Sequence, residues 1–101
     1  MKLRFRQYGG YTGLISGVDE IDTEAMPEKE AQYLTQLVKD SSILEMRSEK
    51  STQGRDLQKY DITVETTDGI RQVSFDDMTM PENVIPLLQY LQSLATPKQP
   101  Q

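Results

Sequence analysis

A glycine-rich stretch that follows a short alternating segment is the feature that most constrains the fold of this chain. Leu3 and Phe5 alternate with charged residues over residues 2–8, which predicts a β-strand with one apolar face. The next residues are Tyr8-Gly9-Gly10-Tyr11-Thr12-Gly13-Leu14, and glycine tolerates the positive φ angles of a tight turn or a bulged loop. We therefore expect a β-hairpin whose second strand ends near Ile21.

The second predicted strand has alternating residues on the side that we expect to be buried, namely Leu14, Ser16 and Val18. Gly17 lies within this strand. A glycine inside a strand indicates either a bulge or the close approach of another backbone.

The chain contains no histidine and no cysteine among its 101 residues. This excludes disulfides, catalysis by a histidine base, and metal sites built from imidazole or thiolate ligands. General acid–base catalysis by carboxyl groups would need them to be desolvated. The candidate pairs are Asp19/Glu20, Asp22/Glu24 and Asp76/Asp77. They lie at predicted strand ends and helix starts, where acidic side chains cap helices and stay in water, so we expect no enzyme, no metal ion and no cofactor.

The net charge of −5 argues against a nucleic-acid partner, because such binding depends on neutralising phosphates. Lys2, Arg4 and Arg6 nevertheless share one face of the first predicted strand. They form either a solvated face opposite Leu3 and Phe5 or a phosphate-binding stripe. The solvated face is the interpretation that we favour.

The chain has no apolar run that approaches the ~20 residues of a membrane span. Charges interrupt residues 1–6, where a secretory signal would have a continuous apolar region. We expect a cytoplasmic protein that contacts no membrane. One domain over residues 1–95 and a flexible tail over residues 96–101 would account for the length.

Two segments have apolar residues at helical spacing. The first is expected to begin at Pro27, a favourable first-turn residue, and the second at Pro86, because a proline deeper in a helix costs a hydrogen bond. The predicted buried stripe of the first is Ala31, Leu34, Leu37 and Val38, and the second element has Val84, Leu87, Leu88, Leu91 and Leu94 at helical spacing. Between them, residues 47–58 are polar and without period, which is typical of either a functional loop or an ordinary connector.

The clearest hairpin signal lies between residues 60–64 and 72–75. Asp68-Gly69 is a favoured centre for a type I′ turn. That turn would pair Val64 with Val73 and Ile62 with Phe75, so that the apolar pairs share one face.

The chain also shows a weak internal repeat, in which residues 22–28 resemble residues 76–82. Each half then reads as two strands, an Asp-x-x-x-Met-Pro-Glu segment and a helix. The predicted fold is therefore α+β, a four-stranded antiparallel sheet with two helices on one face, built as a pseudo-repeat of two ββα units. Chance similarity between two helix starts is the alternative.

The order and spacing of these motifs resemble the emfourin family over about residues 3–94. The motifs are Phe5-x-x-x-Gly9-Gly10-Tyr11-x-Gly13-Leu14, Met26-Pro27 before an acidic helix, Tyr60-x-Ile62-Thr63-Val64 followed by residues 73–77, and Pro81-x-x-x-x-Pro86-Leu87-Leu88-x-x-Leu91. Emfourins are small bacterial protein inhibitors of thermolysin-like zinc metallopeptidases such as protealysin. The resemblance therefore implies an inhibitor that occludes a peptidase cleft with surface loops.

The resemblance implies that Met26 and Gly54 contact the peptidase, and we add Gly10 and Tyr11 of the first turn as partner-binding candidates. Met26 would either fill the bulky apolar pocket beside the scissile bond or pack back on the first helix. Gly54 would either let the backbone approach the enzyme or be an ordinary loop glycine. We expect a monomer when free. The alternative function is a non-catalytic protein-interaction module of the same fold with a different partner.

Overall fold

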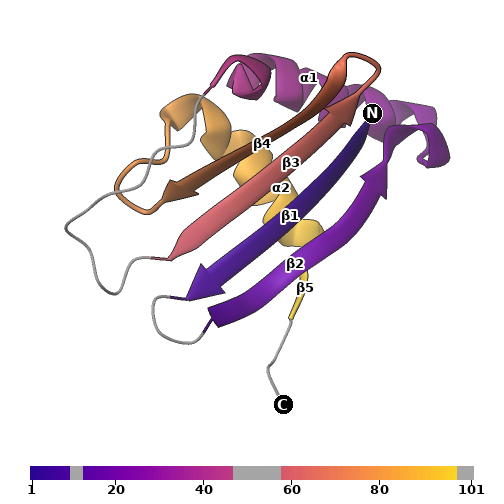
Figure 1. The fold of residues 1–101 in the computed structure, drawn as a ribbon. Helices are drawn as coiled ribbons and strands as arrows, with labels where there is room; N and C mark the ends of the chain where they lie inside the picture. Colours follow the sequence, from indigo (N-terminus) through magenta and orange to yellow (C-terminus); the bar gives the residue numbers. More distant parts are fainter. Residues whose placement is uncertain (10–12, 47–57, 98–101) are drawn as a thin grey trace.

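The computed structural model describes residues 1–9, 13–46 and 58–97, which form a sheet with helices behind it (Figure 1). The strands of this described part pair antiparallel in the spatial order β4-β3-β1-β2-β5. Their bounds are Lys2–Gly9 for β1, Gly13–Asp22 for β2, Lys59–Thr66 for β3, Gly69–Asp76 for β4 and Thr96–Pro97 for β5. The helices are α1 (Glu28–Ser41) and α2 (Ile85–Leu94).

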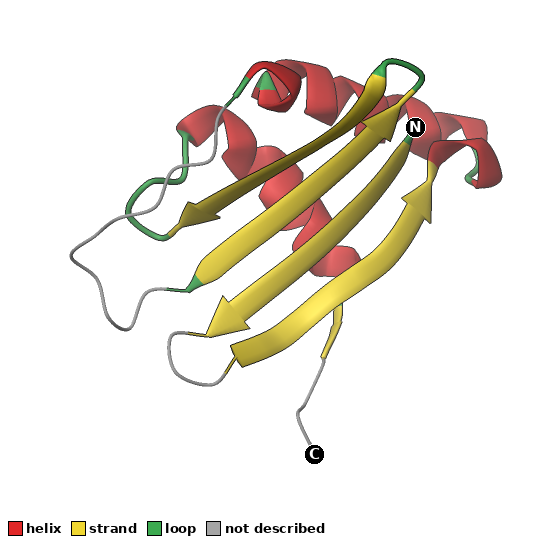
Figure 2. Ribbon diagram, viewed as in Figure 1, coloured by secondary structure: helices red, strands yellow, loops and turns green. Residues whose placement is uncertain are grey.

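Both helices cover the same face of the sheet and leave the other face open (Figure 2). Four of the strands are long, whereas β5 has two residues. This confirms the predicted α+β fold with a four-stranded antiparallel sheet and two helices on one face. The pseudo-repeat stays a prediction. None of the helices in the described ranges is long and apolar enough to cross a membrane.

The core lies between the sheet and the helices. Alternation along β1 puts Leu3 and Phe5 into this core, where they are 2% and 0% exposed. The helical stripes meet them from the other side and include fully buried Leu34, Leu87 and Leu91. Each such side chain contributes roughly 1.5–3 kcal/mol through burial, so the helices are held mainly by this apolar contact.

The first hairpin contains irregularities that sequence alternation does not reveal. The β1–β2 register shifts between Leu3 and Phe5 and again between Gln7 and Tyr8. As a result Val18 lies opposite Phe5 on the core side, whereas Leu14 lies opposite Tyr8 on the open face. The expectation that Leu14 is on the buried side is therefore wrong, because the bulge changes the parity of the strand.

Gly17 marks a close approach between β1 and β2. A Cβ atom at this position would lie 2.5 Å from the carbonyl oxygen of Phe5, which is backbone and cannot rotate away. The close-approach reading of this glycine is thus confirmed.

We predict that Gly17→Ala lowers the free energy of unfolding by about 1–3 kcal/mol, because the strands must separate to admit the methyl group. Urea denaturation monitored by circular dichroism measures the loss. Ser16→Ala, one residue earlier in β2, is the control and should change stability little. Equal stabilities of Gly17→Ala and the wild type would contradict the close approach.

The loop of the second hairpin lies one residue earlier than predicted, so the β4 partner of each β3 residue lies two residues earlier than predicted. Thr66 pairs with Gly69, and Ile62 with Val73, so Thr67 and Asp68 form the loop. The loop is not type I′, because that turn needs positive φ at both central residues and only Gly69 has it, at 137°. A shift of two residues preserves parity, so the apolar residues still share the core face.

The sheet extends beyond α2 through β5. Thr96 pairs with Gly17 and Pro97 with Ser16. These two residues belong to the segment expected to be a tail, and residues 98–101 lie outside the described part of the chain.

Candidate functional site

Strand pairing defines two ends of the sheet. At one end Asp76, Lys59, Tyr8 and Leu14 lie side by side on the four long strands, and we call this the Tyr8 end. At the other end, which we call the Lys2 end, Lys2 lies between Asp22 and Glu65. The six-residue step from Lys2 to Tyr8 along β1 spans about 20 Å.

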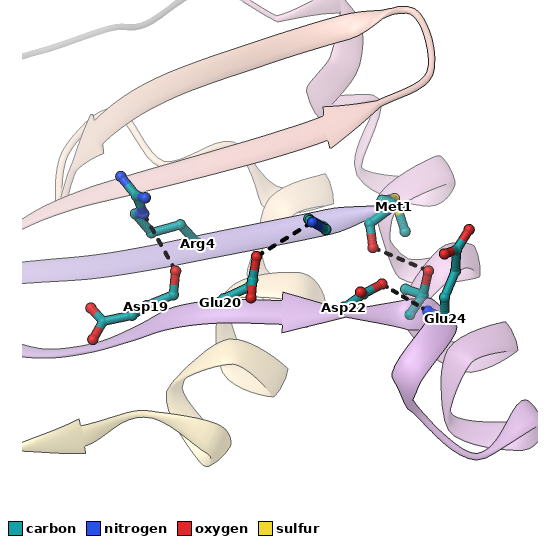
Figure 3. Close-up of polar contacts among 8 residues, drawn as sticks. Met1, Arg4, Asp19, Glu20, Asp22 and Glu24 are labelled. Atoms are coloured by element: carbon teal, nitrogen blue, oxygen red, sulfur yellow. Dashed lines mark hydrogen bonds and ion pairs between the residues drawn. The ribbon is translucent and has the colours of Figure 1, made fainter.

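Met26 lies at the Lys2 end, in the junction between β2 and α1. Asp22 Oδ1 accepts a hydrogen bond from the Glu24 N–H at 2.9 Å, which caps the short 3₁₀ turn η1 (Thr23–Ala25) (Figure 3). Thr23 donates to the Met1 carbonyl through its backbone N–H at 3.0 Å and through its hydroxyl at 3.1 Å. The junction is therefore tied to Met1, and α1 begins at Glu28, one residue after the predicted start, with Pro27 as its N-cap residue.

The Met26 side chain is half-buried and packs against the core, whereas Ala25 and Pro27 beside it are exposed. This packing agrees with the alternative in which Met26 packs back on its own protein instead of filling a peptidase pocket. The remaining exposed part of the side chain lies between exposed neighbours, where a partner can reach it. The structure thus places Met26 at an accessible junction without making it a protruding residue.

The surface around Met26 is acidic. Asp22, Glu24 and Glu28 lie on the junction or at the start of α1. The Lys2 ammonium lies 3.7 Å from the Glu20 carboxylate, and Arg4 Nε donates to the Asp19 carbonyl at 3.4 Å (Figure 3). Both contacts are exposed, so they organise the surface but contribute little to stability.

Gly10, Tyr11 and Gly54 lie outside the described residues, but their described neighbours can be located. Gly9 and Gly13 close the β1–β2 pairing at the Tyr8 end. Gln58, four residues after Gly54, precedes β3 at the same end. The described flanks of Gly10 and Tyr11 therefore lie at the Tyr8 end together with Gln58. Met46, the nearest described residue before Gly54, lies toward the Lys2 end, where its carbonyl accepts a hydrogen bond from Arg71 Nη1 at 3.2 Å. Met26 also lies at the Lys2 end.

A hydrogen-bond network fixes Gln58. Asp77 accepts hydrogen bonds from the Gln58 N–H at 3.1 Å and from the Tyr60 hydroxyl at 2.6 Å. Gln7 Nε2 donates to Gln58 Oε1 at 2.7 Å, and Gln92 Nε2 donates to Gln7 Oε1 at 3.2 Å. The network connects β1, β3, α2 and the residue after β4, so the Tyr8 end is held by side chains as well as by the strand ladder.

Tyr60 is the titratable group at the centre of this network. Burial raises the pKa of its hydroxyl, and the hydrogen bond and negative charge of Asp77 raise it further. The folded state therefore keeps the Tyr60 proton at a pH where the unfolded chain, with a tyrosine pKa of about 10, releases it. The stabilising contribution is complete below pH 10 and is lost as the pH rises through the raised pKa.

We predict that Tyr60→Phe lowers the free energy of unfolding at pH 7 by about 1–2 kcal/mol, because Asp77 loses a hydrogen-bond donor. The variant should also lose less stability than the wild type when the pH is raised above 10. Urea denaturation across pH 7–11 tests both effects. A parallel decline of the two proteins in the alkaline range would contradict the raised pKa.

The turn after β4 contains an exposed residue that sequence reasoning missed. Asp76 is buried, whereas Met78 is 65% exposed. Asp76 and Asp77, considered above as a carboxylate pair, accept hydrogen bonds from N–H groups of this turn, from the Gln58 N–H and from the Tyr60 hydroxyl. An aspartate that bonds the backbone two residues later is a recognisable turn signal, but the signal does not say which neighbouring side chain will be exposed.

The carboxylates of the described ranges do not gather into a metal site. Within residues 1–9, 13–46 and 58–97 no group of three or more acidic residues is placed to hold a metal ion. Asp22 and Asp76 instead serve as backbone acceptors in turns.

The fold defines the chain as a small α+β domain with a four-stranded antiparallel sheet and two helices on one face. The sequence model of the Emfourin family matches residues 5–92. The chain therefore belongs to the Emfourin family. No curated protein and no solved structure matches the chain.

Proposed function

We propose that this protein inhibits a thermolysin-like zinc metallopeptidase of the protealysin type. The observation that carries the proposal is the family match over residues 5–92, because the Emfourin family is known for inhibitors. The absence of histidine and cysteine from the whole sequence supports a role without catalysis. Three carboxylates of the acidic pairs considered as catalytic groups accept hydrogen bonds that hold the fold. They are Asp22, Asp76 and Asp77.

The proposed mechanism is steric occlusion of the peptidase cleft. The chain offers only carboxylates and backbone carbonyls to a zinc ion, which are weaker competitors for the site than imidazole or thiolate ligands. Backbone hydrogen bonds and side-chain networks hold both sheet ends before binding, so docking needs little ordering of the described surface.

We propose Met26, Gly54, Gly10 and Tyr11 as contact residues of the complex. A standard protein interface buries about 800 Å² on each partner, which corresponds to a patch roughly 30 Å across. Such a patch can cover both ends of a sheet that is about 20 Å long between Lys2 and Tyr8. One peptidase molecule can therefore touch Met26 and the Tyr8 end together.

A titration of the purified protein against protealysin at fixed peptide substrate tests the function. We expect loss of peptidase activity with a one-to-one end point. Full activity in the presence of a large excess of the protein would overturn the proposal and favour an interaction module with another partner.

We predict that Met26→Gln raises the inhibition constant about tenfold, because a polar end group of similar length would have to enter an apolar pocket. Met46→Gln is the matched control, since Met46 is also half-buried against the core. Both variants should show similar small losses of thermal stability. Equal inhibition constants for the two variants would remove Met26 from the interface.

A further inference from the structure

Met78 differs from the other methionines of the described chain that pack on the core. Met26, Met46 and Met80 are half-buried there, whereas 65% of Met78 is exposed. Exposing a large apolar side chain gains nothing in the free protein, since its burial would release about 25 cal/mol for each Å² of apolar surface. A binding partner can realise that gain.

The backbone that presents Met78 is fixed on both sides. The buried Asp76 carboxylate accepts hydrogen bonds through Oδ1 from the Met78 N–H at 2.9 Å and from the Thr79 N–H at 3.0 Å. The Thr79 hydroxyl donates to the same Oδ1 at 3.1 Å and accepts the Asp76 N–H at 3.0 Å. The Met78 backbone is therefore ordered before binding, which lowers the entropy cost of an interface.

The turn after β4 also places Met78 beside other predicted contact segments. Asp77, adjacent to Met78, bonds Gln58 and Tyr60, and Asp76 pairs with Lys59 of β3. Met78 therefore lies at the Tyr8 end, where β1 and β2 close their pairing at Gly9 and Gly13. No other large apolar side chain in this post-β4 turn is exposed to a comparable degree, because Met80 packs on the core.

We infer that Met78 is an apolar anchor of the inhibitory surface and inserts into a hydrophobic pocket of the peptidase cleft. The inference rests on the proposed function and identifies Met78 as the side chain at the Tyr8 end that anchors the peptidase. Methionine suits this role because its unbranched, polarisable side chain adapts to the shape of a pocket, and it is enriched at protein interfaces. Met78 meets the requirement for an exposed bulky side chain better than the half-buried Met26 does.

The test compares Met78→Ser with Ile70→Ser as inhibitors of protealysin at fixed peptide substrate. Ile70 is a matched control because it is 70% exposed and lies on β4, across the sheet from the end of β2 that leads to Met26 and at the opposite end of β4 from Asp76. We expect Met78→Ser to raise the inhibition constant at least tenfold, Met78→Leu to restore most of the inhibition, and Ile70→Ser to leave it unchanged. The melting temperatures of the two serine variants should stay close to that of the wild type, since both side chains are exposed.

The outcomes separate the two proposals. Inhibition by the wild type together with an unchanged constant for Met78→Ser overturns the Met78 anchor and leaves the proposed function standing. Equal losses in Met78→Ser and Ile70→Ser would also overturn the anchor, because the effect would not be specific to this turn. Absence of inhibition by the wild type overturns the proposed function and the anchor with it.

Discussion

The antiparallel pairing of β1 with β3 is the constraint on which the rest of this structure depends. It joins residues 2–8 to residues 59–65, and its register runs from Lys2 opposite Glu65 to Tyr8 opposite Lys59. Each hairpin alone would be marginal in water, whereas the joined sheet has a continuous apolar face for both helices. The same register decides which turns share an end of the sheet. It brings the post-β4 turn and the end of β1 to one side and leaves the β2–α1 junction on the other.

The sequence predicted the fold well because its apolar patterns have distinct periods. Alternation at Leu3 and Phe5 and helical spacing at Leu34 and Leu37 each allow one buried face, and the core is formed by those faces. The errors arose where backbone geometry overrides side-chain pattern. The turn at Asp68-Gly69 was misplaced because Gly69 supplies its positive φ at the strand end rather than inside the loop. Alternation alone also does not reveal the bulge that turns Leu14 to the open face.

The two turns that precede the helices show why the site was harder to predict than the fold. Asp22 and Asp76 both accept a backbone N–H two residues later, at 2.9 Å in each case. Met26 and Met80, which follow them at the same spacing, both pack on the core. These matched contacts support the pseudo-repeat, which stays a prediction. The second turn exposes an apolar residue, Met78, two residues after Asp76. The equivalent residue of the first turn is Glu24, which is polar. The Met-Pro motif does not include this position, so the motif does not predict the exposed methionine.

Hydrogen–deuterium exchange of the protein, with and without a catalytically inactive protealysin variant, tests most directly whether the sheet ends form the inhibitory surface. The account predicts slower exchange at the β2–α1 junction around Met26 and around residues 58–60 and 76–79, and unchanged exchange in the buried centre of α2. Unchanged exchange at both ends of the sheet under saturating peptidase would contradict it.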